Sequence, residues 1–398
     1  MKRITPWLSW LFSFAVTLTL LITSVVIPGA SAADPSAAQV PTDPLLILMN
    51  GDLWSWAPGD AAPQQLTTWG YVTLPALSPD AQRVAYNAWA SAAVQAVEQG
   101  QPVTGVIPSN IAVLDLATGQ SQTIADQPAG VAFDPNTGWQ SAIMRGQPAW
   151  SPDGTRLAWS EFAVPENVYR LVVYDLAAAQ QTVIVPNLPM PYADAGNIPV
   201  HRVQWSTWGI SVHTVAVNPE SGDFEERVTI YDALGAQLAE HLIGSSVSEF
   251  TLMHVWVEFE GVELLGLLYP SGKQFMLDPG SGEQYDMPSP PLLVSTSTTG
   301  PSAALTPAPN NDPESDERAL WFLLTPDRQS SEALDTTGFP GPEIVAISPD
   351  GLSVAFVGEQ VQVWQNNTIT PVPGTEGLSS EAAVLWGPVK WRVPSGEA

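Results

Sequence analysis

The sequence predicts an all-β protein folded as a β-propeller of about six four-stranded blades, with seven as the alternative. Three observations predict this fold. A short turn motif recurs at residues 78–81, 151–154 and 348–351. Groups of about four short strands recur at a spacing of roughly 40 to 70 residues. The last group has only two strands, and the strands that follow residue 44 supply the missing pair. Chain start and chain end are therefore expected to share one blade and to leave no open edge.

The clearest copy of the turn motif is Ser151-Pro152-Asp153-Gly154. The proline presets φ for a turn, and the serine and aspartate side chains can bond nearby backbone amides. The glycine accepts the positive φ that closes a hairpin. Alternating apolar residues on both sides, such as Leu157 and Trp159, fit half-buried strands.

The N-terminal residues predict export. Lys2 and Arg3 precede an uncharged apolar run from Trp7 to Ile27, and Ala30-Ser31-Ala32 has the small-x-small pattern of a cleavage site. We expect a signal peptide over residues 1–32 and a secreted, periplasmic or extracellular protein. The alternative is an uncleaved helix that anchors the protein in a membrane. A Pro/Ala-rich tether is expected over residues 33–44.

The propeller is expected over residues 45–393, and residues 394–398 form a tail. The expected strands, in chain order, are 45–49, 53–56, 64–67, 74–77, 83–86, 111–116, 120–124, 149–150, 157–160, 170–176, 181–185, 203–205, 210–217, 227–231, 237–242, 250–257, 263–269, 273–277, 283–287, 354–357, 361–364, 369–372, 383–386 and 389–393. A seventh blade is expected only if residues 292–324 contain further strands.

The turn copies identify a resemblance to a known family. Residues 75–80, 148–154 and 346–351 resemble the WD40-like PD40 repeat of TolB-like bacterial β-propellers, and residues 111–119 are similar to its third strand. This resemblance implies a six-bladed ring and says little about function, because such propellers serve as scaffolds and as enzymes. The sequence departs from the repeat at Ala81, which replaces the turn glycine, and at Ser206-Thr207-Trp208-Gly209.

Composition narrows the functional classes. The 398 residues carry 13 Lys and Arg against 40 Asp and Glu, for a formal charge of −27. Such a surface repels nucleic acid and anionic bilayers, so neither is an expected partner. Solubility alone is the other explanation of the acidity. The absence of cysteine excludes disulfides and thiolate metal sites.

Loop lengths predict one elaborated end of the ring. The turns between first and second strands and between third and fourth strands are short. The other end receives the long loops 87–110 and 288–317, where residues 92–98 could form a helical turn or two. Because long loops on a rigid scaffold commonly carry binding sites, we expect this end to be functional. Its candidate binding residues are Glu161, Glu166, Glu220, Asp223, Glu225, Glu226, Trp89 and Trp139. They could equally be solvated loop charges and aromatics that cover the blade ends.

Catalytic motifs are absent from the sequence. There is no G-x-S-x-G elbow, no H-E-x-x-H pair and no calcium loop. We therefore assign no catalytic residue, metal ligand or cofactor. His201, His213, His241 and His254 lie in or beside expected strands, where hydrogen bonds would satisfy them. A metal cluster assembled from different blades stays open as an alternative.

These observations favour an exported, monomeric, non-enzymatic propeller that binds an unknown protein or cell-envelope component through its acidic loops. The first alternative is an exported glycan-active lyase or hydrolase with a site in the central channel. The second is a sensor domain held by an uncleaved N-terminal helix. A meeting of the histidines with carboxylates at one end of the channel would favour the enzyme.

Overall fold

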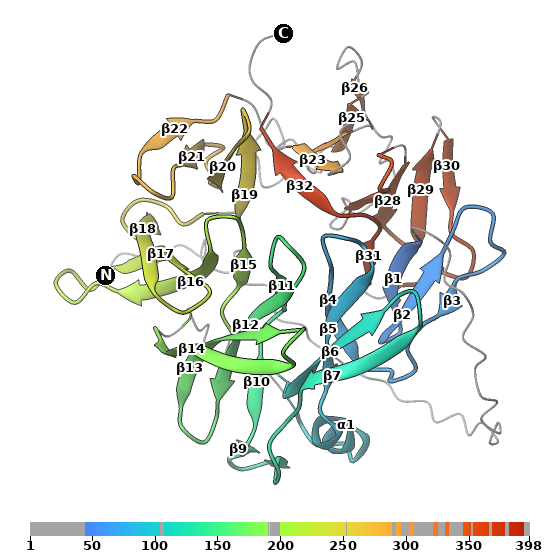
Figure 1. Ribbon diagram of the computed structural model, residues 1–398, viewed down its shortest axis with the longest axis horizontal. Coiled ribbons are helices and arrows are strands. Elements are labelled where there is room, and N and C mark those ends of the chain that lie inside the picture. Colours follow the sequence, from blue (N-terminus) through green and yellow to red (C-terminus); the bar gives the residue numbers. More distant parts are fainter. Residues whose placement is uncertain are drawn as a thin grey trace, which may run out of the picture.

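The structure is a computed structural model, in which sheets are arranged radially around a centre (Figure 1). It describes residues 44–103, 107–189, 191, 200–251, 253–288, 292–295, 302–305, 321–324, 331–333, 345–351, 353–365, 368–378 and 382–393. The expected signal peptide, nearly all of the tether, most of loop 288–317 and the tail lie outside these residues. In the described part of the chain, no helix is long and apolar enough to cross a membrane.

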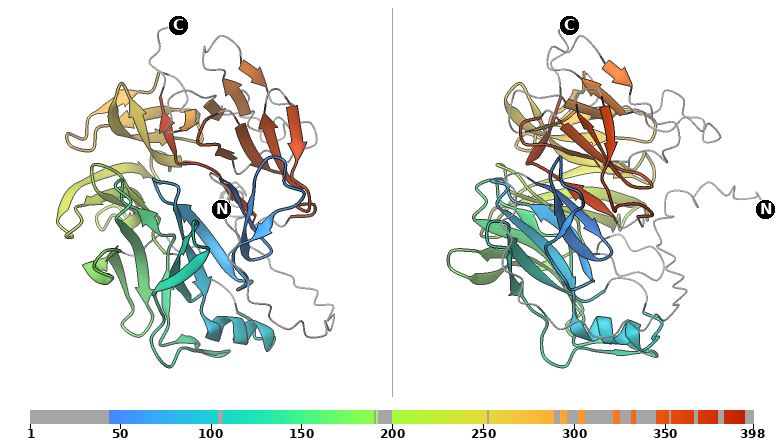
Figure 2. Two further views of the ribbon diagram at one scale, coloured as in Figure 1. Left: turned by 45° about the vertical axis from the view of Figure 1, so that its right-hand side comes forward. Right: turned by 90° about the vertical axis from the view of Figure 1, so that its right-hand side faces the viewer.

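One sheet joins the two ends of the described chain, as the sequence predicts. The strand β1 (Leu45–Met49) lies between β2 (Asp52–Trp56) and β31 (Ala383–Leu385), and β1 pairs with β31 in an antiparallel register. Blue and red strands accordingly lie side by side in Figure 1 and Figure 2. The sheet contains, in spatial order, β3 (Gln64–Gln65), β2, β1 and β31.

The next three sheets follow one another along the chain, and each is antiparallel. The first contains β4 (Val72–Leu77), β5 (Arg83–Trp89), β6 (Ser109–Asp115) and β7 (Gln120–Ala125). The second contains β10 (Ile143–Arg145), β11 (Ala149–Trp150), β12 (Arg156–Ala163), β13 (Val168–Asp175) and β14 (Gln180–Leu188). The third contains β15 (Val203–Trp205), β16 (Ile210–Val217), β17 (Phe224–Tyr231) and β18 (Gln237–Ser245).

The remaining strands form a nine-stranded sheet and a four-stranded sheet. The nine-stranded sheet has β32 (Val389–Arg392) at its centre, with one set of four strands on each side of it. β32 pairs with β19 (Met253–Phe259) of one set and with β23 (Leu292–Ser295) of the other. One set is β19, β20 (Val262–Leu268), β21 (Gln274–Leu277) and β22 (Gln284–Asp286). The other is β23, β24 (Ser302–Leu305), β25 (Trp321–Leu324) and β26 (Ser331–Ala333). The four-stranded sheet is β27 (Val345–Ile347), β28 (Ser353–Val357), β29 (Val361–Gln365) and β30 (Thr368–Pro371).

The fold class is therefore a β-propeller. Among the described residues there are six sheets of four or more strands, and residues 292–324 contribute strands to the nine-stranded one. The observed pairing of the last two strands differs from the predicted pairing in one respect. Only β31 joins the sheet of β1, whereas β32 is held beside β19, where Lys390 and Arg392 both pair with Glu258.

The repeated turns have one geometry. In residues 151–156 the Ser151 hydroxyl lies 2.5 Å from an Asp153 carboxylate oxygen and accepts the Arg156 N–H at 2.9 Å. The corresponding distances around Ser348 are the same, and both turn glycines have φ +68°. At Ala81 the chain adopts φ +55° without a glycine. These serine side chains are buried, so each turn is held by hydrogen bonds to a buried hydroxyl group.

Apolar side chains fill the spaces between neighbouring sheets. Trp159 and Leu157 are fully buried, and they pack with Ile111 and Ala85 of the preceding sheet. The indole N–H of Trp150 donates to the Ala76 carbonyl at 2.8 Å, which links two sheets. Trp150 and Trp159 thus pack between neighbouring blades.

Candidate functional site

The candidate binding residues range from buried to exposed, and Trp89, Asp223 and Glu225 are partly buried. Glu161, Glu226 and Trp139 are less than one tenth exposed. Glu161 lies in β12, and Glu225 and Glu226 lie in β17, so these three are not loop residues as predicted. Trp89 also lies in a strand, at the end of β5, and Trp139 lies in the short strand β9 (Gly138–Gln140). Only Glu166, Glu220 and Asp223 lie in turns.

Glu161 belongs to the core because its strand is longer than predicted. Its carboxylate accepts from Arg145 Nε at 2.8 Å and from the indole of Trp159 at 3.0 Å. Arg145 also donates to the carbonyls of Ser109 and Asp126, so it connects two sheets. A buried pair of opposite charges with satisfied hydrogen bonds is a structural connection.

The long loop after β5 packs against the segment of β8 (Ala132–Asp134) and β9 that precedes the next blade. It contains α1 (Ser91–Glu98), whose Ala93 and Ala96 are buried in a cluster with Trp139. The helix contacts β8, which forms a hairpin with β9. Trp139 therefore packs beneath these loops. The helix predicted over residues 92–98 is confirmed, and it lies at the periphery of the ring (Figure 2).

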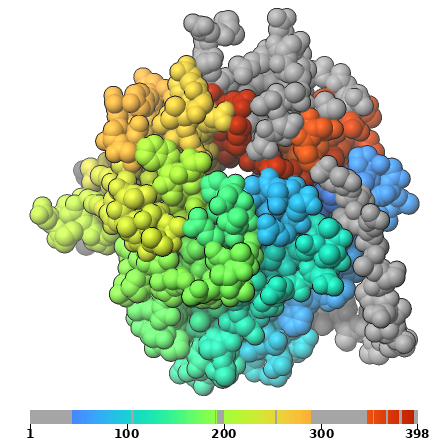
Figure 3. All heavy atoms as spheres, viewed as in Figure 1, coloured from blue at the N-terminus to red at the C-terminus, as the bar shows by residue number. Residues whose placement is uncertain are grey.

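The turn of the β16–β17 hairpin is well ordered, with Glu220 exposed and Glu225 partly buried. The Asn218 side chain accepts the Glu220 N–H at 2.9 Å and donates to Glu225 at 2.6 Å. Hydrogen bonding to Arg227 holds the pKa of Glu225 below its ordinary value. The hairpin projects from the left edge of the molecule in Figure 3. Glu161 and Glu226 thus do not contribute to an acidic surface, and the conformation of this turn is fixed by hydrogen bonds within it.

Exposed apolar side chains flank this acidic turn. Val217 is 55% exposed, and Phe224, directly opposite it in the register, is 41% exposed. Val247 is 74% exposed, next to Ser246, whose hydroxyl accepts the Phe224 N–H. We refer to Val217, Phe224 and Val247 as the apolar tip. Exposed apolar residues gathered around rigid polar groups are typical of interaction surfaces.

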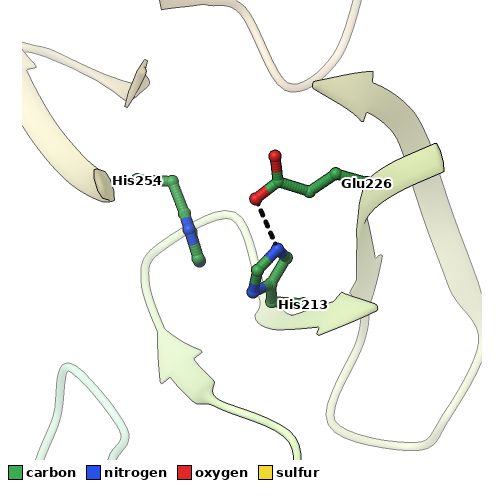
Figure 4. Close-up of side chains that lie close together, drawn as sticks. All are labelled: His213, Glu226 and His254. Atoms are coloured by element: carbon green, nitrogen blue, oxygen red, sulfur yellow. Dashed lines mark hydrogen bonds and ion pairs between the residues drawn. The ribbon is translucent and has the colours of Figure 1, made fainter. Parts of the chain in front are cut away.

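A polar cluster lies further along the same face of the hairpin. The register places Val217 and Phe224, then Glu226, then His213 on this face. His213 Nε2 lies 2.7 Å from a carboxylate oxygen of Glu226, and the rings of His213 and His254 are 4.4 Å apart between centroids (Figure 4). His254 comes from β19 of the neighbouring sheet. Strands of two blades thus bring two imidazoles and one carboxylate together.

Backbone and hydroxyl groups hold the Glu226 carboxylate. It accepts the Thr251 N–H at 2.7 Å and the Thr251 hydroxyl at 2.5 Å. Gly244 lies against the carboxylate, and a Cβ at that position would come within 2.5 Å of Glu226 Oε2. The position of the carboxylate is therefore fixed before any ligand arrives.

Burial determines the charge of two histidines in this region. It lowers the pKa of His254 well below its ordinary value, and the charges of His213 and Arg202 lower it further. Burial also lowers the pKa of His201 to about 4, although the hydrogen bond to the Pro189 carbonyl opposes this shift. Both imidazoles are neutral at neutral pH, and a neutral imidazole can donate a lone pair.

The sequence did not reveal the cluster. His213 and Glu226 lie on adjacent strands, and their pairing depends on the β16–β17 register. His254 is brought to them only by the contact between two sheets. One signal in the sequence could have shown that Glu226 points inward. Glu226, Val228 and Ile230 are every second residue of one strand, so they lie on the same face of it.

Comparison with known proteins shows no family for this chain. The sequence matches no protein-family model and no curated protein. Similar solved structures include an oligogalacturonate lyase from Vibrio parahaemolyticus, with 13% identity, a TM-score of 0.48, and coverage of 81% of this chain and 84% of that one. The β-propeller domain of the Trilobed protease from Pyrococcus furiosus shows 12% identity, a TM-score of 0.43, and coverage of 75% and 84%. An acylaminoacyl peptidase from Pyrococcus horikoshii shows 10% identity and a TM-score of 0.46 over 76% of this chain, which spans 45% of that protein.

Proposed function

We propose that this propeller is a binding scaffold that engages a protein or another cell-envelope component through the apolar tip and the acidic turn between β16 and β17. One observation carries this proposal. Val217, Phe224 and Val247 are exposed together beside Glu220 and Asp223, on a turn held by its own hydrogen bonds.

The physical argument has two parts. Apolar side chains gain free energy when a partner covers them, by roughly 25 cal/mol per Å² of buried apolar surface. Because the turn is already ordered, little conformational entropy is lost on binding. The surrounding carboxylates would steer a partner with a basic rim, and that contribution would weaken as salt is added.

We also propose that this scaffold is exported and that it is a TolB-like propeller. The support for export is the basic, then apolar, then small-residue order of residues 1–32. The support for the family is the shared geometry of the turns at Ser151 and Ser348. The mass of the mature N-terminus tests export: loss of residues 1–32 supports a signal peptide, whereas their retention supports an anchor.

Affinity capture from a cell-envelope extract tests the scaffold role. We expect the triple variant Val217→Ser, Phe224→Ser, Val247→Ser to retain the fold and to lose at least about tenfold of the binding of any captured partner. The matched control is Leu234→Ser with Leu238→Ser, since these leucines are 86% and 55% exposed in a different turn and strand. Equal losses in both variants, or undiminished binding by the triple variant, would contradict the proposed surface.

A glycan-active lyase or hydrolase is the second candidate. The observation that favours it is the 2.7 Å contact between His213 and Glu226, because a histidine beside a carboxylate can act as an acid or base. Bond cleavage in an oligosaccharide panel that is lost in His213→Gln would support this candidate. Equal cleavage by that variant and the native protein would refute a role for the contact.

A further inference from the structure

We propose that His213, His254 and Glu226 bind a divalent transition-metal ion of the Zn²⁺ type. The proposal does not depend on the scaffold role. Among the described residues, these three form the group of histidine and acidic side chains that could hold a metal ion, and their ligand atoms all lie within 4.8 Å of one another. Figure 4 shows the Glu226 carboxylate directed at His213, with the ring of His254 beside them.

The donor set determines the class of ion. Two imidazole nitrogens and one carboxylate oxygen suit Zn²⁺ and its first-row neighbours. Ca²⁺ and Mg²⁺ prefer oxygen ligands throughout, so this set does not suit them. The chain has no cysteine, and a thiolate site for soft ions is therefore impossible.

The distances allow an ion to enter after small movements. Ligands about 2.1 Å from a tetrahedral ion are about 3.4 Å from one another. His213 Nε2 and Glu226 Oε1 are 2.7 Å apart, so they would separate slightly, and the proton between them would be released to solvent. The remaining ligand separations are at most 4.8 Å, and rotation of the rings would shorten them.

The surroundings fit a metal site with one open position. Thr251 holds the carboxylate through two hydrogen bonds, which is the outer support that metal ligands usually have. The side chain of His213 is 26% exposed, so the cluster has contact with solvent. Three protein ligands leave a fourth position for water or another small ligand. The charge of Arg202, near His254, opposes cation binding, and the Glu226 carboxylate offsets it.

Calorimetric titration of the chelator-treated full chain with Zn²⁺ tests the proposal. The buffer should have high ionic strength, because salt screens nonspecific binding to the acidic surface. We expect one ion per chain and at least about tenfold weaker binding in Glu226→Gln and in His254→Gln. The matched controls are Glu263→Gln and His241→Gln, which lie outside the cluster and should bind like the native protein. Thermal unfolding without metal shows whether each variant is folded.

Cobalt(II) absorption of the native chain provides a second test that needs no variant. Intense visible bands from a nitrogen-containing tetrahedral site are expected, and Zn²⁺ should abolish them. A spectrum like that of aqueous cobalt would overturn the proposal. So would the absence of stoichiometric Zn²⁺ binding, or equal affinity of the native protein and a folded His254→Gln variant.

Discussion

Two buried carboxylates illustrate how neighbouring blades use the same side chain differently. Glu161 and Glu226 are 1% and 3% exposed, and each lies in a strand near the β12–β13 or the β16–β17 turn. Glu161 faces Arg145, whose charge is permanent, and both side chains are closed off from solvent. Glu226 faces the imidazole of His213, whose side chain is 26% exposed.

The difference lies in whether the partner can be replaced. The guanidinium of Arg145 is bound on several sides by carbonyls and a carboxylate, so its removal leaves a buried charge unpaired. An imidazole can lose its proton or bind a metal ion instead. The Arg145 pair therefore stabilises the ring, whereas the His213 pair has the chemistry of a binding site.

Removal of the charge on Glu161 should give the largest effect. Glu161→Gln leaves the buried Arg145 without its counter-ion, and we expect a loss of about 3–5 kcal/mol in the free energy of unfolding. Denaturant unfolding of the purified chain measures this loss. A cost below 1 kcal/mol would mean that the pair is not a structural connection.

Acid should destabilise the folded protein through the buried histidine His201. The pKa of His201 is about 4 in the folded protein and about 6.5 when unfolded, so the unfolded state binds more protons between these values. Stability is then complete above about pH 6.5 and falls by about 3 kcal/mol as the pH approaches 4. Unfolding curves across this range should show a smaller fall in His201→Gln than in the native protein. Identical pH dependence would refute the assignment to His201.

Glu226→Gln should cost much less than the same change at Glu161. Its partner His213 is 26% exposed, so solvent can replace the lost contact, and we expect the metal-free protein to lose about 1 kcal/mol for weakened hydrogen bonds. The two variants should be compared by denaturant unfolding in the presence of a chelator. If they cost the same, the distinction between the two carboxylates fails.

The exposed pair on the turn after β12 should give the smallest effect. Glu166 lies 3.4 Å from Arg170, and its side chain is 55% exposed. We expect Glu166→Gln to change stability by less than about 0.5 kcal/mol, because water and salt screen the pair. A larger cost in thermal unfolding would show that exposed pairs matter here as much as the buried one.

The sequence predicted the turns and the ring better than the site. Ser151, Asp153 and Gly154 determine their own local hydrogen bonds, so the motif is sufficient to identify a hairpin. Glu161 was placed in a loop because the predicted strand ended at residue 160, and only the distant Arg145 makes its burial possible. His254 joins His213 through the packing of two sheets, which no local pattern encodes.

The pairing of β1 with β31 has a consequence for how the protein is made. The ribosome produces β1 early, but its hydrogen-bonding partner at residues 383–385 appears hundreds of residues later. One side of β1 must therefore remain without its partner throughout synthesis, and the ring can close only after translation of these residues. A truncation before residue 383 should consequently leave a molecule prone to self-association through β1, even though most of its blades are complete.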